Sequence, residues 1–81
     1  MTYKKLVTLP PVETALRLGW KPLGKQSTRA KKNFDFFRGD VRFGVLVLPR
    51  GGLQFTVGNE SSTYPVAVME WLHTAASREA A

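Results

Sequence analysis

Apolar and polar residues alternate most strictly in the middle of the chain, between residues 33 and 57. Alternation with a period of two is typical of strands, whose successive side chains point to opposite faces of a sheet. Two turn signals divide this stretch, Gly39-Asp40 and Pro49-Arg50-Gly51-Gly52. The pattern therefore predicts three short antiparallel strands joined by two tight turns.

The two turns fix the register of the predicted strands. Gly39-Asp40 suits a two-residue hairpin loop, because glycine adopts positive φ without steric cost. At the second turn, a three-residue loop over residues 49–51 keeps the apolar residues on one face, whereas a four-residue loop would move them to the other. The predicted core face is made of Phe34, Phe36, Val41, Phe43, Val45, Val47, Leu53, Phe55 and Val57.

The opposite face of the predicted sheet mixes apolar and polar residues. An antiparallel sheet can leave such a face in water, but exposed apolar side chains on it would mark a contact with a partner. Phe37, Leu46 and Leu48 are therefore candidates for a protein interface. Asp35 falls on the same face as Arg42, and we expect the two to form an ion pair.

Helical periodicity appears on both sides of the predicted sheet. Residues 10–18 fit a short helix that begins with proline and is closed by Gly19, with Trp20 packing back onto it. Residues 66–78 fit a longer helix, whose apolar stripe should lie across the core face. This stripe consists of Val68, Trp71, Leu72, Ala75 and Ala76.

These elements predict an α+β fold with a single small domain over residues 1–81. The expected architecture is a three-stranded antiparallel sheet packed by a C-terminal helix and a short N-terminal helix, in α-β-β-β-α order. Residues 3–9 fit either a short extra N-terminal strand or an ordered arm. Residues 58–65 are rich in turn formers and predict a connector.

Charge changes the picture at residues 21–32, which read KPLGKQSTRAKK. The chain has 12 Lys and Arg against 6 Asp and Glu, and no acid occurs between Glu13 and Asp35. Turn-forming residues predict a flexible basic loop here, with room for a short strand near residues 20–23. A segment of one sign favours phosphate contacts over a merely solvated loop. The predicted phosphate contacts are Lys21, Lys25, Arg29, Lys31 and Lys32, extended along the sheet and its turns by Arg38, Arg42 and Arg50.

The residues that carry chemistry are sparse. There is no cysteine, His73 is the single histidine, and the six acids are scattered singly. The spacing of a nucleotide-hydrolysing phosphate loop is absent around Gly24-Lys25. We therefore expect no enzymatic activity, no metal and no cofactor. Without a secretion signal or an apolar run of membrane length, we expect a cytoplasmic protein with no membrane contact.

The predicted element order resembles that of double-stranded-RNA-binding-like folds and of the HicA-type toxin family, in which a short helix ending in Gly-Trp precedes a small sheet. Gly19-Trp20 and the element order carry this resemblance. The histidine that those toxins have on an early strand has no counterpart, because His73 lies in the last predicted helix. The resemblance therefore concerns architecture alone.

Three hypotheses for function follow. The first is a small non-enzymatic nucleic-acid-binding module that contacts phosphates through the basic loop and the sheet edge. The alternative is a protein-binding or inhibitory module that docks on an acidic protein surface, such as another protein's nucleic-acid site. The third is a homodimer formed by edge pairing of the first or third strand. Joint exposure of Phe37, Leu46 and Leu48 would favour the second.

Overall fold

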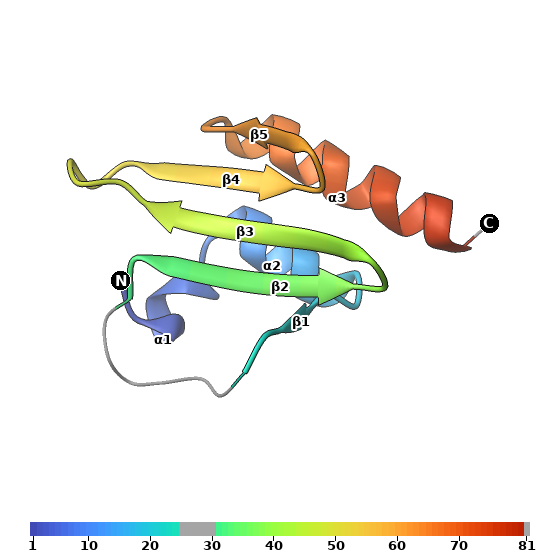
Figure 1. Ribbon diagram of the computed structural model, residues 1–81, viewed down its shortest axis with the longest axis horizontal. Helices are drawn as coiled ribbons and strands as arrows, with labels where there is room; N and C mark the ends of the chain where they lie inside the picture. Colours follow the sequence, from blue (N-terminus) through green and yellow to red (C-terminus); the bar gives the residue numbers. More distant parts are fainter. Residues whose placement is uncertain (25–30, 81) are drawn as a thin grey trace.

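The computed structural model describes residues 1–24 and 31–80, and these form an α+β fold with a five-stranded antiparallel sheet (Figure 1). The strands follow one another in space as they do along the chain. They are β1 (Lys21–Pro22), β2 (Asn33–Arg38), β3 (Val41–Val47), β4 (Leu53–Val57) and β5 (Glu60–Ser62). The helices are α1 (Tyr3–Leu6), α2 (Pro10–Arg17) and α3 (Pro65–Ala80).

The register predicted for the central strands is confirmed. Phe36 lies opposite Phe43 across the first hairpin, and Val45 lies opposite Phe55 across the second. The amide of Leu48 donates to the carbonyl of Gly52 over 2.8 Å, which closes the three-residue loop. Gly51 has a φ of +85°, the left-handed conformation that this loop requires.

The strand count and the start of the chain differ from the prediction. β1 and β5 extend the sheet at its two edges, so the predicted three-stranded sheet has five strands. β5 arises because Gly58, with a φ of +60°, turns the chain back onto β4. Its sequence, Glu-Ser-Ser, carries no apolar alternation, which is why the pattern predicted only a connector there.

The segment before α2 is helical, so the expectation of a short extra strand or an arm is wrong. Thr2 caps α1 by accepting a hydrogen bond from the amide of Lys5 over 3.4 Å. Leu6 is fully buried in the core. The single helical turn keeps this leucine close to the sheet. An extended chain would carry the residues after it farther from the core.

The predicted end of the first helix is confirmed. Gly19 has a φ of +91°, and its amide donates to Leu16 over 3.2 Å. The amide of Trp20 donates to Ala15 over 3.0 Å. These two bonds form a Schellman motif, which satisfies carbonyls at the end of α2. Trp20 is 1% exposed and meets Phe43 edge to face, with the ring centroids 6.1 Å apart.

The core lies on one side of the sheet, and Figure 1 shows the helices on that side. Phe43 stacks against Phe36 and Phe55, with centroid distances of 5.6 and 6.3 Å. Val12 of α2 and Val68 of α3 are fully buried in the same cluster. Because all three helices contribute to this one core, no helix covers the other face in the part of the chain that the structure describes. That face holds the candidate site.

Candidate functional site

The face of the sheet opposite the helices is called the open face below. The registers place side chains on it in three rows across the strands. Lys21, Phe37 and Arg42 form the first row, on β1, β2 and β3. The second row is Asp35, Gly44, Thr56 and Ser61, and the third is Asn33, Leu46 and Gln54. Leu23 joins this face next to β1, because its amide donates to the carbonyl of Asp35 over 2.9 Å.

An ion pair occupies the middle of the open face, as predicted. Both Nε and Nη2 of Arg42 lie 2.7 Å from Oδ1 of Asp35. The pair extends over Gly44, where a Cβ atom would lie 3.3 Å from Nη2 and 3.4 Å from Oδ1. Half of the Arg42 side chain, 52%, remains exposed. Arg42 can therefore bond to a further acceptor while Asp35 holds its orientation.

A shallow hollow of about 320 Å³ lies beside this ion pair. It exists where Gly44 contributes no side chain, and polar groups surround it. Its lining includes Asn33, Arg42, Leu46, Gln54, Thr56 and Ser61. Amides and hydroxyls both donate and accept hydrogen bonds, so this lining suits a polar planar ligand. The sequence pattern did not reveal this part of the site, because Ser61 reaches it only through the unexpected strand β5.

The apolar side chains of the open face do not form one patch. Leu46 is 42% exposed and Phe37 is 36% exposed, whereas Leu48 is half-buried. Leu46 lies opposite Asn33, four positions along β2 from Phe37. At ~3.3 Å per residue this separates the two side chains by about 13 Å, and the Asp35–Arg42 pair lies between them. Leu23, 65% exposed, lies closer to Phe37, at the β1 edge.

Three more of the predicted basic residues gather at one end of the sheet, called the basic end below. Lys31 and Lys32 are exposed and directly precede β2. The carbonyl of Lys32 accepts a hydrogen bond from Val47 over 2.7 Å, so these lysines lie beside the end of β3. Arg50, also exposed, is in the turn that follows β3. Figure 1 shows the start of β2 and this turn at the same end of the molecule.

Arg38 was also predicted to contact phosphates, but it is not part of this surface. Arg38 lies on the helix side of the sheet, and its guanidinium donates to the carbonyl of Leu18 at the end of α2. It is therefore separated from Arg42 by the sheet itself. Lys25 and Arg29 lie outside the described residues.

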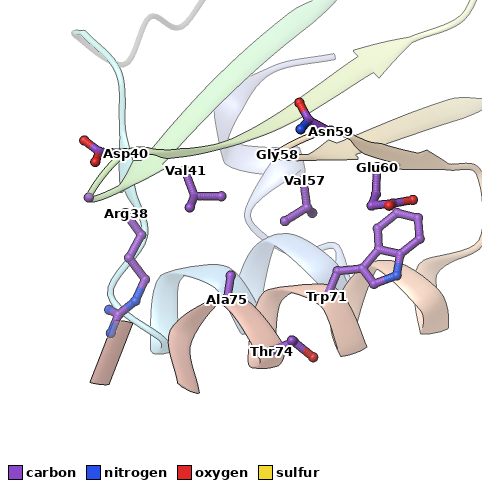
Figure 2. Close-up of a pocket in the computed structure, with 11 residues that line it drawn as sticks. Arg38, Asp40, Val41, Val57, Gly58, Asn59, Glu60, Trp71, Thr74 and Ala75 are labelled. Carbon is purple, nitrogen blue, oxygen red and sulfur yellow. The ribbon is translucent and has the colours of Figure 1, made fainter. Parts of the chain in front are cut away.

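A larger groove, of about 820 Å³, lies on the helix side at the opposite end of the sheet (Figure 2). Asp40 and Glu60 lie at its rim, and the half-buried ring of Trp71 forms part of its wall. Trp71, predicted as a core residue, thus packs against the core while one side faces this groove. Arg38 also lines the groove, but the two carboxylates outnumber it and make the groove a poor place for phosphate, so the groove is not part of the basic surface.

The described residues contain no group of three or more His, Asp or Glu side chains placed to hold a metal ion. His73 is exposed on α3. Within the same residues, every helix is too short or too polar to cross a membrane. Comparisons of the chain with protein-family models, with curated proteins and with solved structures gave no match. The open face and the basic end are therefore the candidate functional site.

Proposed function

We propose that this protein binds nucleic acid without catalysing a reaction. Lys31, Lys32 and Arg50 contact phosphates at the basic end, and Lys21 and Arg42 contact them on the open face. Lys25 and Arg29 remain predicted contacts. Arg38 is left out of this surface, because it bonds to the end of α2 on the helix side.

One observation supports this proposal. Basic side chains border a sheet face that no described helix covers, and the acid on that face is paired with an arginine. Among the residues that the structure describes, Asp35 is the only acid on the open face, and Arg42 pairs with it. Asp40 and Glu60 lie at the other end of the sheet, beside the groove. Phosphates can therefore approach the basic end without meeting an unpaired carboxylate, and the acid on the open face itself is paired.

The test is binding of fluorescent DNA and RNA strands, measured by anisotropy at roughly 50 and 200 mM salt, where phosphate-driven affinity changes steeply. We expect Lys32→Gln to weaken binding of every strand and to lower the slope of log affinity against log salt by about 1. The matched control is Arg17→Gln. It removes the same charge from α2, where Arg17 pairs with Glu13, and should leave binding nearly unchanged.

Equal effects of the two variants would mean that net charge alone attracts the strand, and would remove the basic end from the proposal. An absence of binding to all strands, even at the lower salt concentration, would show that the proposed function is wrong.

The second candidate function is binding of an acidic protein surface through the same face. The exposure of Leu23, Phe37 and Leu46 on one side of the sheet favours it. An acidic partner would engage the basic end as well. This candidate gains if nucleic acids fail to bind and the protein captures an acidic partner whose binding is lost in Leu46→Asp.

A homodimer through the sheet edge receives less support. The prediction placed the first and third strands of the central sheet at its edges, but β1 and β5 cover them, so this premise is wrong. The actual edges have two and three residues. Very short edge strands are a common protection against edge pairing.

A further inference from the structure

We infer that the open face binds single-stranded nucleic acid, and that a base of this strand stacks on Phe37. The inference rests on the proposed function, because it names the kind of nucleic acid and the residue that meets a base. It also gives Phe37 a role other than the protein contact that the sequence predicted.

The position of Phe37 in the first row of the open face carries the argument. Lys21 of β1 lies directly opposite it on one side and Arg42 of β3 on the other. Neighbouring strands are ~4.8 Å apart, so the backbones of Lys21 and Arg42 flank that of Phe37 at about that distance, and all three side chains lie on the open face. A base on the ring would place its own phosphate within reach of one of them. An aromatic platform between basic side chains is how proteins hold single strands.

Phe37 is exposed because its position in β2 directs its side chain to the open face of the sheet. Its neighbour Phe36, on the opposite face, is 1% exposed, whereas Phe37 is 36% exposed. The helices that bury Phe36 cannot reach Phe37 through the sheet. An exposed aromatic residue offers a π-face to any base, whatever the base sequence.

The hollow beside Arg42 extends the same site. Asn33, Gln54, Thr56 and Ser61 line it, and these side chains can bond to the edge of a second base. Single strands are recognised through such combinations of stacking and edge contacts.

A duplex fits this face less well. Its bases are already stacked on one another, so their faces are not available to Phe37, and their edges lie in grooves that a helix or a two-stranded ribbon must enter. The open face is a broad side of a five-stranded sheet. We therefore expect the single strand to be preferred.

The test uses fluorescent oligo(dT) and oligo(U) of about 15 nucleotides, which covers the usual site sizes, and the dT strand annealed to its complement. We expect Phe37→Ala and Phe37→Leu to weaken single-strand binding roughly 5- to 100-fold, since neither has a π-face. Phe37→Tyr should bind like the original chain. The matched control is Tyr64→Ala, which removes an exposed aromatic side chain directly before α3, outside the open face.

A second readout reports the stacking itself. In Phe37→Trp the new indole lies on the open face, while Trp20 is buried and Trp71 lies on the helix side. We expect oligo(dT) to quench the fluorescence of this variant much more than that of the original chain. Retained circular dichroism would show that each variant is folded.

The outcomes separate the inference from the proposed function. Single-strand binding that is unchanged in Phe37→Ala, or lowered equally by Tyr64→Ala, would overturn the stacking site; so would a duplex that binds as tightly as the strand. In those cases a loss of binding in Lys32→Gln would still support the proposed function. If no probe binds the original chain, the proposed function itself fails. The dT and U strands distinguish DNA from RNA as the preferred source of the stacked base.

Discussion

Gly19 stands where the end of α2 meets the guanidinium of Arg38. A Cβ atom at Gly19 would lie 2.7 Å from Nη1 of Arg38. That nitrogen donates to the carbonyl of Leu18, the C-cap residue of α2. A cation at the C-terminus of a helix is stabilising, because the last carbonyls carry partial negative charge. Arg38 therefore has a structural role that its place in a basic sequence did not indicate.

A side chain at Gly19 would strain the backbone and would also displace Arg38. Mutations can separate these two effects. We expect Gly51→Ala to destabilise the protein by about 1–2 kcal/mol, because its φ of +85° is strained for alanine while the space around it is empty. Gly19→Ala carries the same strain at a φ of +91° and also displaces Arg38. We expect about 1 kcal/mol more for the lost hydrogen bond.

Urea unfolding of the two variants and the original chain measures this difference. Equal free energies of unfolding for Gly19→Ala and Gly51→Ala would mean that Arg38 contributes nothing at the end of α2.

At the scale of elements, the strands fall into two groups. β2, β3 and β4 carry the alternating apolar residues, and β3 lies at the centre of the sheet. β1 and β5 have little apolar content and are held mainly by hydrogen bonds to β2 and β4. They nevertheless bring Lys21 and Ser61 to the open face, so the least apolar strands complete the site.

This division predicts a gradient of amide exchange across the sheet. Amides of β3, such as that of Val45, should exchange only through global unfolding, because their side chains are buried on the core face. Amides of β5, such as that of Ser62, which lies opposite Phe55, should exchange faster through local opening. Hydrogen exchange followed by NMR measures both. Equal protection of Val45 and Ser62 would show that the edge strand is as stable as the centre.

Charge is distributed unevenly over the whole molecule, which measures 37 × 25 × 19 Å. The chain has a net charge of +6, yet Asp40 and Glu60 gather at the groove end, opposite the basic end. Screening reduces interactions beyond ~8 Å at physiological salt, so the two ends act independently. Removing an acid should therefore affect binding only where that acid adjoins the proposed surface.

Asp35→Asn tests this locality. It releases Arg42 for phosphate, so we expect tighter nucleic-acid binding at low salt and a slope of log affinity against log salt that is steeper by up to about 1. The lost ion pair should cost no more than ~1 kcal/mol in folding stability, because Arg42 is half exposed. Glu70→Gln makes the same charge change on α3, on the helix side of the sheet, and is the matched control. An equal gain in affinity from both variants would show that Arg42 makes no contact of its own.

The sequence by itself determined the central hairpins, their register and the core face. Turn residues and alternation are local signals, and at residues 33–57 they agree with each other. It also indicated the Asp35–Arg42 ion pair, because the predicted register places both side chains on the same face of neighbouring strands. Two of the three helices, α2 and α3, were found from their periodicity, and the end of α2 from Gly19.

Only the tertiary structure decided that no described helix covers the second face and that β5 extends the sheet. β5 has no apolar pattern, so nothing local in the sequence indicates its pairing with β4, whereas a short strand was expected near residues 20–23, where β1 lies. The same holds for the site. Phe36 and Phe37 are adjacent and chemically identical, but packing of α1, α2 and α3 on one side buries the first and leaves the second between Lys21 and Arg42. Burial depends on contacts between distant segments, and so does the surface proposed to bind nucleic acid.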